Sequence, residues 1–140
     1  MIVLDTNVLS ELMRAQPNEA VLSWLDSQNA QNLKTTAVTV AELLYAIERL
    51  PQGRRKAGLH DAADAMLADE LAGRVIAFDE NAARHYATLV AARDASGRPI
   101  SAADAQIAAI CRQHEAVLAT RNGKDFEETG VTVIDPWMAV

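Results

Sequence analysis

The sequence predicts an α/β protein in which helices cover both faces of a parallel sheet of four to five short strands. Short apolar runs alternate along the chain with longer segments whose apolar residues recur at helical spacing. Most of the short runs are continuously apolar, as is typical of strands buried on both faces of a parallel sheet. The 140 residues fit one domain, residues 1–140, and no repeat, low-complexity tract or linker divides them.

The first half of the chain predicts two strands and four helices. In order, these are a strand over 1–4 (MIVL), helices over 7–14 and 19–28, a strand over 33–38 (LKTTAV), a helix over 39–50 and an Ala-rich helix that extends to about residue 71. Pro17 separates the first two helices, and Pro51 with Gly53 ends the third, because proline interrupts a helix interior.

The second half predicts three strands and two helices. They are a strand over 74–78 (RVIAF), helices over 79–95 and 101–113, and strands over 116–120 (AVLAT) and 131–134 (VTVI). Gly97 and Pro99 separate the two helices, a polar turn (RNGKD) follows the fourth strand, and Pro136 ends the last one.

Charge and cysteine content limit the possible classes of function. Nineteen acids against thirteen Lys and Arg give a net charge of −6, which argues against a protein that coats nucleic acid through bulk positive charge. A local basic rim around an acidic site stays compatible with this balance. A single cysteine, Cys111, cannot form an internal disulfide, and no signal peptide or bilayer-spanning run is visible. We therefore expect a cytoplasmic protein without a membrane partner.

Acidic residues follow strands or begin helices at several points, and each has a local explanation. Asp5 can cap the helix that it precedes. Thr39 and Glu42 have the spacing of a capping box, and Ser101 and Asp104 have an equivalent spacing. Taken singly, these patterns favour capping over chemistry.

Taken together, the acids indicate a shared site. Asp5 and the pair Asn122 and Asp125 follow two strands directly, and the helices that carry Glu42 and Asp104 should begin near the same edge. Ligands of open α/β sheets bind outside the carboxyl ends of the strands. Crowded carboxylates repel one another and raise one another's pKa, and a divalent cation removes that cost.

Such a cluster suits Mg²⁺, which binds carboxylates and keeps several of its waters. The ion lowers the pKa of a bound water and shields charge on a phosphoryl oxygen, so the expected chemistry is phosphodiester hydrolysis without a covalent intermediate. Hydrogen bonds that hold the carboxylates would come from the nearby polar side chains Thr6, Asn7, Ser101 and Thr120.

Other chemistries find little support in the sequence. A phosphatase with an aspartyl nucleophile would have a second Asp where Asn7 stands. The three histidines (His60, His85 and His114) are too widely spaced for a zinc motif, and Cys111 lies on an apolar stripe. There is no P-loop and no dinucleotide-binding glycine motif.

Five segments resemble the PIN-domain family, specifically toxins of the VapC type close to the FitB-like branch. They are LDTNVLSEL at the start, TVAEL around Glu42, SAADAQIAA around Asp104, LATRNGKDF after the fourth strand, and the C-terminal DPW. The resemblance spans all 140 residues and implies a strand order of 3-2-1-4-5. It also implies a Mg²⁺- or Mn²⁺-dependent endoribonuclease whose acidic residues correspond to Asp5, Glu42 and Asp104.

The fourth acidic position departs from the family pattern. Some relatives carry an acid where this chain has Asn122, and Asp125 follows three residues later. If the turn continues into a helical first turn, both residues lie on one face, and both can point at the same ion. The alternative is that Asp125 caps a short helix over residues 126–129.

The resemblance also implies partners. Relatives act as homodimers and are silenced by a small VapB/FitA-like antitoxin, which binds operator DNA. RNA phosphates require cationic neighbours, and Arg121 and Lys124 lie beside the predicted site. The compact basic run Arg54-Arg55-Lys56 fits either an RNA contact or an ordinary solvated helix face.

Two other classes of function compete with the nuclease. A receiver-like signalling domain would bind Mg²⁺ and accept a phosphoryl group on Asp, but it would show paired acids after the first strand. It would also have an Asp after the third strand, where Asp79 instead looks like a helix cap. A catalytically inactive interaction domain would lack at least one of the core acids, and none is missing.

Overall fold

Five parallel strands form one sheet in the order β3-β2-β1-β4-β5. Their bounds are β1 (Ile2–Leu4), β2 (Leu33–Thr36), β3 (Val75–Ile76), β4 (Val117–Ala119) and β5 (Val133–Ile134). In this computed structural model, which describes residues 1–139, Val3 of β1 pairs with Lys34 of β2 on one side and with Leu118 of β4 on the other. The predicted parallel sheet and its strand order are confirmed.

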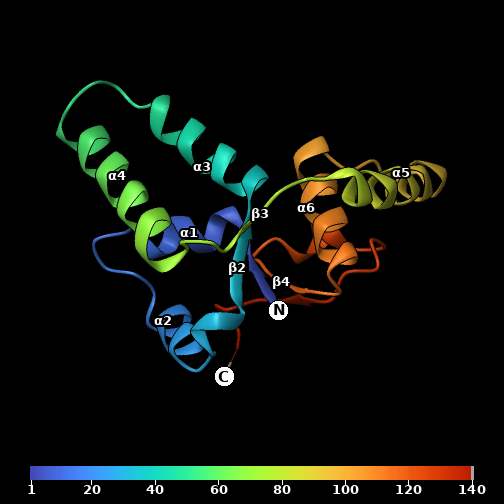
Figure 1. The fold of residues 1–140 in the computed structure, drawn as a ribbon, viewed down its shortest axis with the longest axis horizontal. Coiled ribbons are helices and arrows are strands. Elements are labelled where there is room, and N and C mark those ends of the chain that lie inside the picture. Colours follow the sequence, from blue (N-terminus) through green and yellow to red (C-terminus); the bar gives the residue numbers. More distant parts are fainter. Residues whose placement is uncertain (140) are drawn as a thin grey trace.

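Helices cover both faces of this sheet (Figure 1). One layer contains α1 (Thr6–Leu12), α2 (Glu19–Asp26), α3 (Ala37–Glu48) and α4 (Arg54–Ala65), and the other contains α5 (Glu80–Ala95) and α6 (Ala102–Gln113). Three short turns complete the fold: η1 (Ala30–Asn32), the π-helical turn η2 (Met66–Glu70) that extends α4, and η3 (Gly123–Phe126). Among residues 1–139, no helix is both long enough and apolar enough to cross a bilayer.

Neighbouring residues of the central strands supply two separate cores. Val3 and Leu118 pack with α5 and α6, whereas Leu4 and Ala119 pack with the α1–α4 layer. All four side chains are at most 3% exposed. Because both faces of the sheet are covered, β1 and β4 bury successive residues on opposite faces, which explains their continuously apolar sequences.

The junction between β2 and α3 differs from the predicted one. The helix begins at Ala37 with Thr36 as its N-cap, and the Thr36 hydroxyl accepts a hydrogen bond from the backbone N–H of Thr39 at 3.0 Å. The interpretation of Thr39 and Glu42 as a capping box is therefore wrong. The strand passes into the helix without a loop, so Thr39 is already buried in the first turn and Glu42 lies one turn further on.

Candidate active site

Asp5 lies where the order of the strands reverses direction, directly after β1 and beside β4. Its backbone N–H donates to the Ala119 carbonyl at 3.0 Å and so extends the pairing of the two strands. The carboxylate accepts from the backbone N–H of Thr6 at 2.8 Å and from the Thr120 hydroxyl at 2.7 Å. Burial raises the pKa of Asp5, while the bonds from Thr120 and Thr6 oppose that rise. Asp5 therefore caps α1 with one oxygen and faces the end of β4 with the other.

Polar bonds tie the segment after β4 to the first turn of α1. Asn7 donates from Nδ2 to the Thr120 hydroxyl at 3.0 Å, and its Oδ1 accepts from the backbone N–H of Arg121 at 3.1 Å. The Thr120 hydroxyl also accepts from the Asn122 backbone N–H at 3.1 Å. With both of its lone pairs occupied, this hydroxyl has its proton left for the Asp5 carboxylate.

Glu42 reaches the same region from α3. Its Oε1 accepts from the Thr6 hydroxyl at 2.8 Å, and the side chain is half-buried. Thr6 therefore contacts two of the predicted acids, because its backbone N–H bonds Asp5 while its hydroxyl bonds Glu42. This contact joins α3 to the start of α1.

Asp104 lies in the first turn of α6, which begins after Ser101 as the N-cap. The Ser101 hydroxyl accepts from the Asp104 backbone N–H at 3.2 Å, as the sequence spacing predicts. Burial raises the pKa of Asp104 to about 6, and repulsion from Asp5, Asp125 and Glu42 adds to the rise. The fold thus brings the four predicted acids within electrostatic reach of one another. We call them the carboxylate cluster (Asp5, Glu42, Asp104 and Asp125).

Asp125 lies inside η3 and does not cap a following helix. The turn begins at Gly123, the Asp125 N–H donates to the Asn122 carbonyl at 3.0 Å, and the chain leaves the helical conformation after Phe126. A helix over residues 126–129 is therefore wrong, whereas the turn's helical continuation is confirmed. Asn122 and Asp125 are both exposed, and the Asn122 side chain forms no capping bond.

The donor set of the carboxylate cluster fits a hard divalent cation. Among residues 1–139, no three His, Cys, Asp or Glu side chains are close enough together to hold a metal ion by themselves. Mg²⁺ does not require such a cage, because it keeps several waters and binds through one or two carboxylates. Asp5 and Asp104, whose pKa values are raised, are the residues whose charge an ion would relieve most.

Cys111 and His60 have surroundings that do not favour a nucleophile or a metal ligand. Cys111 is fully buried behind the sheet, and burial raises its thiol pKa to about 12, so it is a protonated core residue at neutral pH. His60 pairs with Asp64 at 3.2 Å on the surface of α4.

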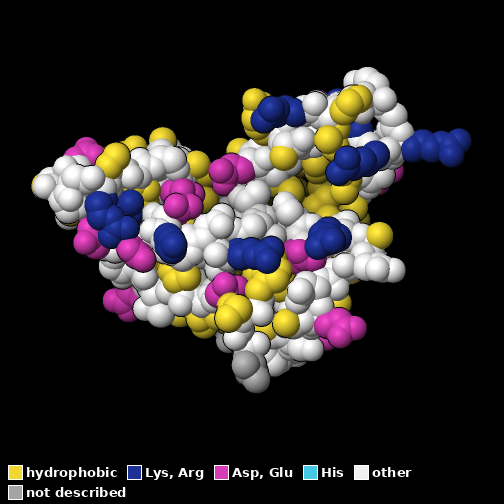
Figure 2. Space-filling model, turned by 180° about the vertical axis from the view of Figure 1, so that it is seen from behind, with side chains coloured by type: hydrophobic (Ala, Val, Ile, Leu, Met, Phe, Trp, Pro, Cys, Tyr) yellow, Lys and Arg dark blue, Asp and Glu magenta, His cyan; other side chains and the backbone are white. Residues whose placement is uncertain are grey.

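Basic side chains lie near the segment that follows β4. The Arg121 guanidinium stacks over the Trp137 ring at 4.8 Å from its centroid, and Lys124 is exposed in η3. Figure 2 shows Lys and Arg side chains spread across one face of the molecule with acidic side chains among them. Lys56 of the Arg54–Lys56 run is bonded to the Glu48 carbonyl at the α3–α4 connection.

Sequence reasoning missed one polar residue that contacts this region. Arg93 of α5 donates to the Asp125 carbonyl from within the protein. No sequence motif marks it, because its partners are backbone carbonyls.

Comparison with known proteins gives a consistent family. The PIN domain model matches residues 2–131. The VapC ribonuclease Y4jK of Sinorhizobium fredii is 44% identical over 137 residues, which cover 98% of each chain. Toxin FitB of Neisseria gonorrhoeae is 42% identical over 137 residues, 98% of this chain and 99% of the relative. A structure of FitAB bound to an IR36 DNA fragment superposes with a TM-score of 0.91 at 40% identity, covering 100% of this chain and 98% of that one.

Substitution of Asp104 by Asn should stabilise the metal-free protein at neutral pH. In the unfolded chain this carboxyl returns to its ordinary pKa of 3.8, so ionising it at a folded pKa of about 6 costs stability. The full shift corresponds to about 3 kcal/mol. Because the group is half-exposed, screening reduces our expectation to about 1 kcal/mol, or about 3 °C in Tm.

The pH dependence has a defined sign. The raised pKa favours the folded state below pH 3.8 and ceases to do so as the pH rises through 6. The gain of Asp104→Asn over the wild type should be largest above pH 7 and should shrink towards pH 4.5. Urea unfolding in EDTA across this range measures the gain, with Asp94→Asn, at an exposed position of α5, as a matched control. A gain that is equal at both ends of the range would contradict the argument.

Proposed function

The chain belongs to the PIN domain family, in its VapC/FitB group of toxin ribonucleases, and on that premise we propose that it cleaves RNA with Mg²⁺ or Mn²⁺. The whole chain, residues 1–140, would act as a single catalytic domain in the cytoplasm. The observation that carries the proposal is that the fold brings four acids from four separate segments to one edge of the sheet, where Thr6 contacts both Asp5 and Glu42 and where Asp104 lies within electrostatic reach of the other three acids. Without a cation, the mutual repulsion of these carboxylates lowers stability.

The proposed roles rest on the positions of the four acids and on the hydrogen bonds to the Asp5 and Glu42 carboxylates. Asp5 and Asp104 would hold the ion, and Glu42 and Asp125 would add their charge beside it. When bound, the ion lowers the pKa of a water molecule and shields developing charge on the phosphoryl oxygen. Thr120 and Thr6 orient Asp5 and Glu42, because each donates its hydroxyl proton to one carboxylate oxygen. Asn7 holds the Thr120 hydroxyl in place, and Ser101 caps the helix that carries Asp104.

Phosphate contacts would come from the segment after β4. Arg121 is held at its backbone by Asn7 and at its side chain by Trp137, so its charge stays near the Asp5 end of the sheet. Lys124 lies in η3 next to Asp125. Both could neutralise phosphates of an RNA strand that crosses the carboxylate cluster.

The partner we propose is an antitoxin of the VapB or FitA kind, through which the complex would bind operator DNA. The solved FitAB complex on DNA supports this assignment for the present chain. A cation blocks an acidic site most directly, so an Arg or Lys of the partner should reach Asp5, Glu42 or Asp104. A homodimer is also part of the proposal.

The receiver-like alternative finds no support in the structure. Asp79, its candidate phosphoryl acceptor after β3, accepts from the Ala82 backbone N–H at 2.9 Å and from Gln113 Nε2 at 3.1 Å. It is the N-cap of α5. A receiver domain would need a second acid at position 7. The side chain there is Asn7, which donates to the Thr120 hydroxyl and accepts from the Arg121 backbone N–H.

Loss of either central acid should abolish cleavage while the protein stays folded. Asp104→Asn should lower the rate of RNA cleavage in Mg²⁺ more than about 100-fold, beyond the effect of an outer-sphere partner. Asp5→Asn should lower cleavage similarly. The variant should stay folded, because an amide oxygen can still cap α1. Circular dichroism checks the fold, and Asp94→Asn is the matched control. Wild-type rates in Asp104→Asn would refute the assignment.

Substitutions at Asp125 and at Asn122, the two candidates for the fourth acidic position, should differ in their effect on Mn²⁺ affinity and cleavage. Asp125→Ala should weaken Mn²⁺ affinity and cleavage by about 10- to 100-fold, the range for an outer-sphere partner. Asn122→Ala should have a milder effect, because a neutral amide oxygen can only accept from a metal-bound water. Isothermal titration with Mn²⁺ separates them. An unchanged affinity in Asp125→Ala would remove this residue from the site.

Expression of the protein alone should slow bacterial growth. Co-expression of the short reading frame expected immediately upstream should restore growth, and Asp104→Asn should be harmless without it. Normal growth in the presence of soluble, Mn²⁺-binding wild-type protein would count against a toxin.

A further inference from the structure

Arg93 is a buried cation in the last turn of α5. The residue is only 4% exposed. In the part of the chain that the structure describes, no carboxylate lies within ion-pairing distance of it. A buried charge of this kind is costly unless hydrogen bonds compensate it.

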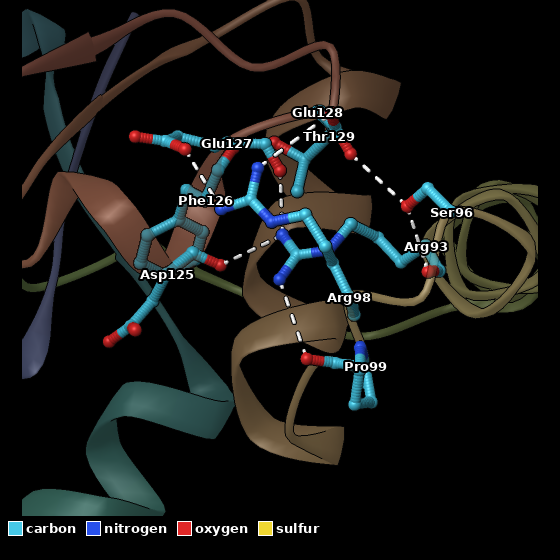
Figure 3. Close-up of polar contacts among 9 residues, drawn as sticks. All are labelled: Arg93, Ser96, Arg98, Pro99, Asp125, Phe126, Glu127, Glu128 and Thr129. Atoms are coloured by element: carbon cyan, nitrogen blue, oxygen red, sulfur yellow. Dashed lines mark hydrogen bonds and ion pairs between the residues drawn. The ribbon is translucent and has the colours of Figure 1, made fainter.

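Four backbone carbonyls provide that compensation (Figure 3). Nε donates to the Arg98 carbonyl at 2.6 Å, and Nη2 donates to the Pro99 carbonyl at 3.4 Å. Nη1 donates to the Glu127 carbonyl at 2.6 Å and to the Asp125 carbonyl at 3.2 Å. The planar fork of a guanidinium can bond in several fixed directions at once, which the single ammonium group of lysine cannot reproduce.

The four carbonyls belong to two segments that each present an acid of the carboxylate cluster. Arg98 and Pro99 lie just before Ser101, the N-cap of the helix that carries Asp104. The other two carbonyls flank Phe126, which is 2% exposed in the core formed with α5 and α6. Arg93 therefore fixes the backbone around Asp125 relative to the start of α6.

The same two segments are also joined at the surface. Arg98 pairs with Glu127 at 2.8 Å and with Glu128 at 3.7 Å, and the Ser96 hydroxyl donates to Glu128 at 3.2 Å. These side chains are about half-exposed, and exposed pairs of this kind contribute little. The buried bonds of Arg93 are the stronger constraint.

We propose that Arg93 is a positioning residue that holds the Asp125 carboxylate at the distance from Asp104 at which both can serve one divalent cation. In Figure 3 the Asp125 carboxylate points away from Arg93 while its backbone carbonyl faces the guanidinium. With that carbonyl held and Phe126 buried, the direction of the Asp125 Cα–Cβ bond is set by the backbone. The inference rests on the proposed function, since it assigns a role at the same cation site.

The test compares Mn²⁺ binding to wild type and to Arg93→Lys by isothermal titration calorimetry. Lysine keeps the charge but cannot bridge both segments, so we expect about 10-fold weaker binding. Arg84→Lys is the matched control on the same helix. Within residues 1–139 its exposed guanidinium bonds Glu80 alone, and the variant should bind Mn²⁺ as the wild type does. Wild-type affinity in a folded Arg93→Lys protein would overturn the inference.

A double-mutant cycle separates positioning from general support of the fold. If Arg93 acts through Asp125, then Arg93→Lys should lose most of its effect on Mn²⁺ affinity in an Asp125→Ala background. The same fold-loss in both backgrounds would show that Arg93 acts on the structure as a whole, and would overturn the proposed role.

A measurement on the wild type covers the case in which Arg93→Lys does not fold. The Arg93 Nη1–H groups bond the Asp125 and Glu127 carbonyls, so their resonances should stay in place when Mg²⁺ saturates the site, because the held segment already presents the Asp125 carboxylate. Loss of these bonds or a large shift of their resonances at saturation would show that the segment rearranges on binding, and would overturn the inference while leaving the proposed nuclease intact. Failure of the wild type to bind Mn²⁺ or Mg²⁺ at all would overturn both.

Discussion

The hydrogen bond from the Thr120 hydroxyl to the buried Asp5 carboxylate joins the ends of the two central strands. Everything else in the site is placed relative to this bond. Because β1 and β4 are neighbours in the sheet, Asp5 and the segment after β4 lie side by side. Asn7, in the first turn of α1, donates a hydrogen bond to Thr120 and holds the two segments together. Ligand sites of open α/β sheets occur at such reversals of strand order. Glu42 is then attached through Thr6.

The cost of this arrangement is electrostatic. Burial raises the pKa of Asp5 and of Asp104, and repulsion from the neighbouring acids adds to the rise. A protein selected only for stability would replace at least one of them by a neutral residue. Functional sites commonly depart from the rules that stabilise the rest of a structure. The capping bonds at Asp5 and Ser101 partly offset the cost, since they use the same residues to begin helices.

Capping and cation binding are therefore compatible roles and do not compete at this edge. Asp5 caps α1 and still directs an oxygen towards β4. Ser101 caps α6 and thereby presents Asp104 one turn inside the helix. At Asp125 the capping explanation is wrong, because η3 begins before it. Whether an acid only caps a helix or also faces the other acids depends on the positions of the helices in the tertiary structure.

The sequence by itself determined the class of fold, because continuous apolar strands and helical stripes admit few other packings, and it identified the four acids and their polar neighbours. Only the tertiary structure decided that Thr36 rather than Thr39 begins α3, since the absence of a loop depends on how closely the helix packs on the strand. The role of Arg93 was also invisible in the sequence. Its four partners are backbone carbonyls, which every residue has, so no pattern of side chains predicts these bonds. Only the tertiary structure brings the two distant segments together around the guanidinium.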